Sequence, residues 1–154
     1  MAFNERKKVI LVHIAKPCHS PNFKHDLPWC FFDRACHGLP GLCGVGIVFH
    51  LRANPYYLLK FGAGRGTNTH AKLIALWALL QFAKDKEYWS IQVAGDSKVI
   101  IDWFKGLAQL ESIVLIFCQH RICELQESFD AISLSICIGS LIIRLMFFQR
   151  KIYI

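Results

Sequence analysis

Two aspartates follow short, mostly apolar runs in this sequence. Asp33 comes directly after residues 29–32, and Asp96 comes after residues 91–94 and one glycine. Short apolar runs predict buried strands, and open α/β sheets hold reactive groups where strands end. A hydrolase that cleaves phosphodiesters with two metal ions needs several carboxylates at such a point. Alternatively, Asp33 opens a turn and Asp96 caps a helix, which are common structural roles for aspartate.

The elements that would position these aspartates follow from the apolar periodicity. Turn-rich connections separate the first three predicted strands, which indicates an antiparallel meander. The order is strand, strand, strand, helix, strand, helix, helix, strand, and an earlier run at 8–15 also has strand character. The predicted strands are 29–32, 44–51, 56–61, 91–94 and 131–138, and the predicted helices run from about 67 to 84, 99 to 106 and 113 to 127. This pattern predicts an α/β fold with a mixed five-stranded sheet and flanking helices.

Three motifs resemble boxes of one known family. Residues 31–35 read Phe-Phe-Asp-Arg-Ala, residues 67–76 begin Thr-Asn-Thr-His-Ala-Lys, and residues 95–97 read Gly-Asp-Ser. They resemble the F-D-G-A, T-N-N-x-A-E and G-D-S boxes of the ribonuclease H-like, reverse-transcriptase-associated domains abundant in plants. The resemblance covers about residues 28 to 135. It implies the ribonuclease H fold and a D-E-D-D carboxylate set that binds two Mg²⁺ and cleaves the RNA strand of an RNA–DNA hybrid.

The resemblance places Asp33 first and Asp96 third in that catalytic, metal-binding set. The second position falls on Lys72, where an ammonium replaces a glutamate. A cation there would repel metal ions and pair with the remaining aspartates. The fourth position belongs to a box with His and Asp, and the residues after Ser135 contain neither. Arg34 also departs from the family, because it replaces the glycine beside Asp33.

The charge balance is consistent with a nucleic-acid partner. The 18 basic and 11 acidic residues leave a formal charge of +7, which suits a polyanion as well as ordinary solubility. We predict that Arg34, Asn68, Thr69 and Lys98 contact phosphates, since a helix N-terminus suits an anion. The expected partner is an RNA–DNA hybrid or duplex, read by its shape and 2′-hydroxyls. Mg²⁺ is expected only if hydrolysis survives, and no small-molecule cofactor is expected.

Three functions stay open on the sequence alone. The first is a nucleic-acid-binding domain whose hydrolysis is lost or weakened. The second is an active Mg²⁺-dependent hybrid ribonuclease that recruits Asp102 or Glu87 as a replacement ligand. The third is a non-functional fragment derived from a retroelement, with a membrane-prone or aggregation-prone tail.

The domain division is a lead-in at 1–27, the ribonuclease H-like domain at 28–135 and a divergent apolar tail at 136–154. The tail suggests a truncated or frame-altered C-terminus, and a membrane role for it is disfavoured because Gly139, Ser140 and Arg144 interrupt it. The seven cysteines form no C-x-x-C pair, so we expect free thiols and no zinc site. A monomer inside the cell is expected, in the nucleus or the cytoplasm, because the N-terminus lacks a secretory pattern.

Overall fold

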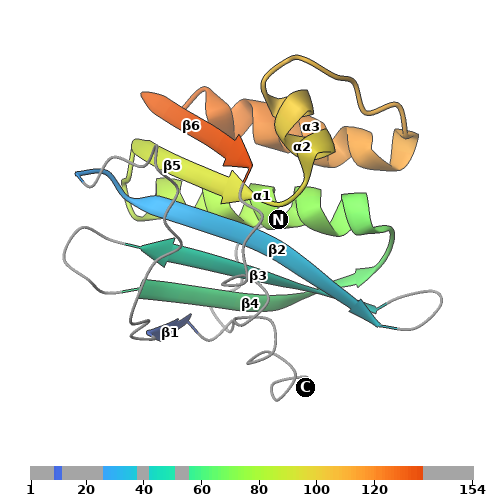
Figure 1. The fold of residues 1–154 in the computed structure, drawn as a ribbon, viewed down its shortest axis with the longest axis horizontal. Coiled ribbons are helices and arrows are strands. Elements are labelled where there is room, and N and C mark those ends of the chain that lie inside the picture. Colours follow the sequence, from blue (N-terminus) through green and yellow to red (C-terminus); the bar gives the residue numbers. More distant parts are fainter. Residues whose placement is uncertain (1–8, 12–25, 38–41, 51–55, 137–154) are drawn as a thin grey trace.

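A computed structural model of the chain describes residues 9–11, 26–37, 42–50 and 56–136. Its strands form one sheet in the order β1-β4-β3-β2-β5-β6, and α1 and α3 lie along one face of that sheet (Figure 1). The strands are β1 Val9–Leu11, β2 Trp29–His37, β3 Leu42–His50, β4 Tyr56–Arg65, β5 Ser90–Gly95 and β6 Ala131–Ile136. The helices are α1 Asn68–Asp85, α2 Lys98–Phe104 and α3 Ile113–Gln126.

The predicted mixed sheet is confirmed. β2, β3 and β4 form an antiparallel meander, while β5 pairs parallel with β2 and β6 pairs parallel with β5. A short edge strand is added to these five, because β1 pairs antiparallel with β4. The predicted lead-in segment therefore contributes backbone to the sheet, at the run where the sequence indicated a strand.

Two strands are longer than predicted. β2 continues to His37 and β4 continues to Arg65, so the predicted strand ends at residues 32 and 61 are wrong. The reason is long-range pairing: β3 supplies hydrogen-bond partners along the whole of β2, and a register shift between Cys43 and Gly44 lets β4 follow. Asp33 consequently lies within β2, paired with Gly46, rather than at its end.

The core lies between the sheet and α1. Leu73, Leu76 and Leu80 recur at helical spacing along α1, and all three are fully buried. Burial of each such side chain stabilises the fold by about 1.5–3 kcal/mol. The helix begins where predicted, because the Thr67 hydroxyl accepts a hydrogen bond from the backbone N–H of His70 at 3.2 Å. This cap fixes the register of the first turn of α1, which carries residues of the predicted site.

The cysteines are not all free thiols, which corrects the prediction from their spacing. Cys43 on β3 is disulfide-bonded, and its cross-strand neighbour in the ladder is Cys36 on β2. Cys30, Cys118 and Cys123 are free. The spacing of the cysteines in the sequence, which forms no C-x-x-C pair, does not indicate this disulfide.

Gly95 is expected to tolerate no side chain. A Cβ at this position would lie 2.7 Å from carbon atoms of the buried Phe32 ring, on the neighbouring strand. Because the ring is 1 % exposed and packed in the core, Gly95→Ala is expected to reduce the free energy of unfolding by about 1–3 kcal/mol. Urea denaturation measures this, with Gly62→Ala as the control, since nothing lies within 4 Å of a Cβ there. Equal stability of the two variants would contradict this packing.

Candidate functional site

The topology of the sheet brings the two predicted aspartates together. Phe32 and Gly95 form the last matched pair between β2 and β5, and β5 ends at Gly95. Asp33 follows Phe32 along β2, while Asp96 follows Gly95 as the chain leaves β5. The negative charge of Asp96 raises the pKa of the Asp33 carboxyl, which is consistent with the two carboxylates lying near each other. The site is therefore built at the carboxyl end of β5, as strand topology predicts.

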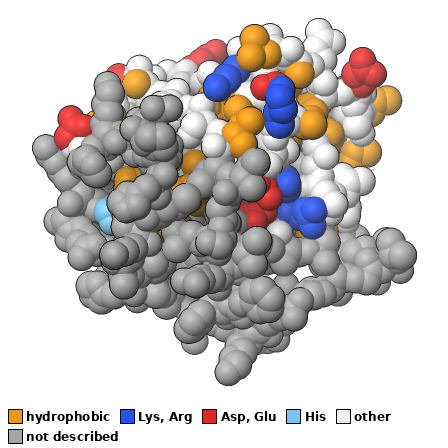
Figure 2. All heavy atoms as spheres, in the orientation of Figure 1, with side chains coloured by type: hydrophobic (Ala, Val, Ile, Leu, Met, Phe, Trp, Pro, Cys, Tyr) orange, Lys and Arg blue, Asp and Glu red, His pale blue; other side chains and the backbone are white. Residues whose placement is uncertain are grey.

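Lys72 reaches into this site from α1. Its Nζ lies 2.9 Å from Oδ1 of Asp96, and the two side chains are 14 % and 38 % exposed. The ion pair anticipated from the sequence is thus present, and its partner is Asp96. An ammonium donates three hydrogen bonds and accepts none, so it occupies a carboxylate oxygen that a metal ion would otherwise coordinate. Figure 2 shows adjoining acidic and basic side chains on this face of the molecule.

Asp33 is the more buried carboxylate of the pair, at 8 % exposed. Burial is the main reason that its pKa rises from 3.8 to about 6, and the negative charge of Asp96 raises it further. A hydrogen bond of 2.7 Å from the backbone N–H of Arg34, together with the charges of Lys72 and Arg34, opposes this rise. The charged form of Asp33 is therefore disfavoured by its surroundings despite two cations nearby.

Arg34 is half-buried beside Asp33. Its Nε is buried and has no hydrogen-bond partner among the residues that the structure describes. A buried donor without a partner costs about 1–3 kcal/mol. The contact between Arg34 and phosphate that the sequence suggested stays a prediction.

The other predicted contacts lie around the start of the two helices that border the site. Asn68 and Thr69 form the first turn of α1, where Asn68 is exposed. Lys98 opens α2 with its side chain 74 % exposed, and it forms an ion pair with Asp102 one turn further on. No described contact joins Asn68, Thr69 or Lys98 to Asp33 or Asp96.

The structural alternative for Asp96 is wrong. Ser97, not Asp96, caps α2, because its hydroxyl accepts from the backbone N–H of Ile100 at 3.4 Å. The two residues considered as replacement ligands do not join the aspartates. Asp102 forms an ion pair with Lys98, and Glu87 lies beyond the far end of α1. Over the described ranges, no three His, Cys, Asp or Glu side chains come close enough together to hold a metal ion.

These residues do not fit two Mg²⁺ ions. A pair of Mg²⁺ ions needs several oxygen ligands in near-octahedral geometry, whereas this site offers two aspartates with an ammonium on one of them. The position of the fourth family carboxylate falls after β6, in residues 137–154, outside the described residues.

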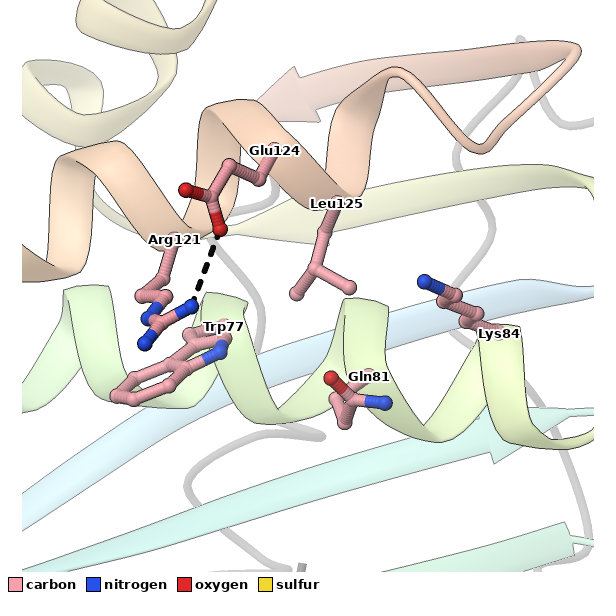
Figure 3. A pocket seen from close by; sticks show the side chains of 6 residues that line it. All are labelled: Trp77, Gln81, Lys84, Arg121, Glu124 and Leu125. Atoms are coloured by element: carbon pink, nitrogen blue, oxygen red, sulfur yellow. Dashed lines mark hydrogen bonds and ion pairs between the residues drawn. The ribbon is translucent and has the colours of Figure 1, made fainter. Parts of the chain in front are cut away.

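A pocket of about 190 Å³ lies away from this site, between α1 and α3 (Figure 3). Its walls carry two cations, one carboxylate and an indole, and Figure 3 shows Arg121 lying beside the ring of Trp77. The sequence did not indicate this pocket, because its residues come from helices far apart in the chain. They are Trp77, Gln81, Lys84, Arg121, Glu124 and Leu125.

The fold and the motifs place the chain among known proteins. The RNase H1 of the halophilic archaeon Halobacterium salinarum superimposes with a TM-score of 0.67 at 28 % identity, covering 74 % of this chain and 87 % of that one. The N-terminal RNase H domain of rv2228c from Mycobacterium tuberculosis gives 0.68 at 22 % identity, over 80 % and 93 % of the two chains. LC11-RNase H1 in complex with an RNA/DNA hybrid gives 0.65 at 18 % identity, over 71 % and 84 %.

Among curated proteins none matches the chain. The model of the family described as "Reverse transcriptase-like" matches residues 31–137, which is more than half of the sequence. That match begins two residues before Asp33 and includes Lys72 and Asp96. The chain therefore belongs to the reverse transcriptase-like family, and its described residues form a ribonuclease H-like domain.

Proposed function

We propose that this domain binds an RNA–DNA hybrid or duplex and has lost most or all of the hydrolytic activity of the hybrid ribonucleases. The observation that carries the proposal is the ion pair of 2.9 Å between Lys72 and Asp96. In this pair the Lys72 ammonium neutralises Asp96, which is one of the two family carboxylates identified in this chain. The site is thereby changed from one that attracts metal ions to one that attracts phosphate.

The binding half of the proposal has separate support. A solved RNase H1 of this fold is in complex with an RNA/DNA hybrid, and this chain has a formal charge of +7. Three features lie near the site: the Nε of Arg34, which has no hydrogen-bond partner within the described part of the chain, the first turn of α1 at Asn68 and Thr69, and the exposed Lys98. Cations and backbone N–H groups of this kind bind phosphates whatever the base sequence, so no sequence preference is expected.

The hydrolytic half follows from what the carboxylates can do. Hydrolysis of a phosphodiester needs a base to activate water and positive charge on the leaving oxygen. Asp33, with a pKa of about 6, is the remaining carboxyl that could take up a proton, but among the described residues no second carboxylate near it is left free to hold a divalent ion with it. Loss of such ligands costs several kcal/mol of metal binding and transition-state stabilisation.

A salt titration of hybrid binding tests the phosphate contacts. The logarithm of the association constant is expected to fall linearly with the logarithm of salt concentration, with a slope that loses about one unit in Lys98→Ala because one phosphate contact is removed. Lys86→Ala, an exposed lysine at the far end of α1, serves as the control and is expected to keep the slope. Binding that does not depend on salt would contradict the proposal.

An active ribonuclease is the second candidate, and the convergence of Asp33 and Asp96 favours it. It predicts Mg²⁺-dependent cleavage that Asp96→Asn abolishes. The third candidate, a fragment with a membrane-prone tail, concerns residues 137–154, outside the described residues. None of the helices that the structure describes is long and apolar enough to cross a membrane.

A further inference from the structure

The first half of α3 exposes an unusual amount of apolar surface. Residues 113–118 are all apolar, but the domain buries two of them, Leu115 and Cys118. Ile113 is 82 % exposed, Val114 69 % and Phe117 57 %. An amphipathic surface helix presents polar residues to water, and a helix that is apolar on every side is normally covered on every side. Figure 2 shows hydrophobic side chains gathered at the end of the molecule that carries α2 and α3.

The centre of this surface is held in place by the rest of the domain. The Phe117 ring packs edge-on against Trp77 of α1, with 5.8 Å between ring centroids. The guanidinium of Arg121 lies over the same ring at 5.2 Å. An exposed aromatic side chain fixed from two sides loses little conformational freedom on binding, which is the usual property of an interface anchor.

Charges of opposite sign stand at the two ends of this apolar surface. Exposed Glu111 precedes α3, while Arg121 lies two turns into it, on the stripe that also carries Ile113 and Phe117 at i, i+4 and i+8 spacing. Besides the Phe117 ring, Arg121 contacts Glu124 in an ion pair on the surface at 3.2 Å. Such a pair is weak, so Arg121 is available to a further carboxylate.

We propose that the α3 face, Ile113, Val114, Phe117 and the flanking Glu111 and Arg121, binds a second copy of this chain. In an isologous pair the two α3 helices run antiparallel about a twofold axis near Phe117. Glu111 then lies opposite Arg121 of the partner subunit, and the apolar residues between them cover one another. A surface that is negative at one end and positive at the other is complementary to itself when reversed, whereas an acidic or basic partner would match one end alone. This proposal departs from the monomer expected from the sequence.

Sedimentation velocity of the full chain, from about 1 to about 100 µM, tests this proposal. The wild type is expected to shift from monomer to dimer across this range, and Phe117→Glu is expected to stay monomeric with an unchanged circular dichroism spectrum. Trp89→Glu is the control, because Trp89 is an exposed aromatic residue outside α3, at 38 %. A wild type that is monomeric throughout, or a Phe117→Glu variant that still associates, would overturn the proposal.

A charge exchange identifies the second copy as the occupant. Glu111→Arg and Arg121→Glu, made singly, each place like charges opposite one another twice in a symmetric dimer, and each is expected to raise the dissociation constant about tenfold. The double variant restores opposite charges and is expected to return to within about threefold of the wild type. These residues are exposed, so the variants test association rather than folding. A double variant as weak as the single ones would overturn the antiparallel arrangement.

Discussion

Replacing Lys72 with glutamate is expected to raise the affinity of this domain for Mg²⁺ by at least about 100-fold. The substitution removes the ammonium that lies 2.9 Å from Asp96 and adds a carboxylate at the position where the family has one. Three carboxylates, with Asp33, would then face one point. The charge of the site changes by two units, and each unit interacts with a divalent ion by several kcal/mol even at a protein-like dielectric constant. Isothermal titration with Mg²⁺ measures the gain.

Two matched variants separate coordination from net charge. Lys84→Glu makes the same charge change at the far end of the same helix and is expected to give no gain, because Lys84 lines the pocket between α1 and α3. Lys72→Gln removes the cation without adding a carboxylate. Its affinity for Mg²⁺ is expected to lie between those of Lys72→Glu and Lys84→Glu. If Lys72→Glu bound Mg²⁺ no better than Lys84→Glu, the ion pair between Lys72 and Asp96 would not be the reason that this site disfavours metal ions.

Replacing Asp33 with asparagine is expected to stabilise the fold at neutral pH by up to about 3 kcal/mol. The pKa of this carboxyl is about 6 in the folded chain against an ordinary 3.8, and that difference corresponds to about 3 kcal/mol. Because the folded-state pKa is the higher one, the unfolded chain loses its proton first as pH rises. The stability contributed by protonated Asp33 is therefore complete below about pH 4 and is lost as pH rises through 6.

Urea denaturation of Asp33→Asn and wild type at pH 4, 5, 6 and 7 measures this difference. Asparagine keeps the oxygen that accepts from the backbone N–H of Arg34 and carries no charge to bury, so the stability gain should grow across that range. Asp130→Asn, at an exposed position, is the control and is expected to show no such growth. A gain that is already complete at pH 4 would point to packing rather than to the buried charge.

Much of the site could be predicted from local sequence. The three motifs carry Asp33, Lys72 and Asp96, and the apolar pattern sets the order of strands and helices that brings them together. The charge of Lys72 predicts that it pairs with an aspartate of the site. The sequence does not predict that this aspartate is Asp96, because the partner depends on how the first turns of α1 pack against the end of β5. The burial that raises the pKa of Asp33 likewise depends on both neighbouring strands.

Features set by long-range packing were missed or misplaced. β2 continues for four residues after Asp33 because β3 pairs with β2 along its whole length. The local sequence around Asp33 does not indicate this long-range pairing. Ser97 caps α2 although aspartate is an equally good capping residue, and Asp96 pairs with Lys72 instead. The sequence predicts the helix at 113–127, but not that much of its apolar first half is exposed. The pocket between α1 and α3 exists only once the two helices pack.

A single assay tests the central claim most directly: the full chain is mixed with an RNA–DNA hybrid labelled on its RNA strand, and both retardation and cleavage are followed as Mg²⁺ is added. The ion pair between Lys72 and Asp96 predicts a retarded complex whose RNA strand stays intact at every Mg²⁺ concentration. Cleavage that depends on Mg²⁺ and disappears in Asp96→Asn would contradict the loss of hydrolysis. An unretarded hybrid would contradict the binding itself.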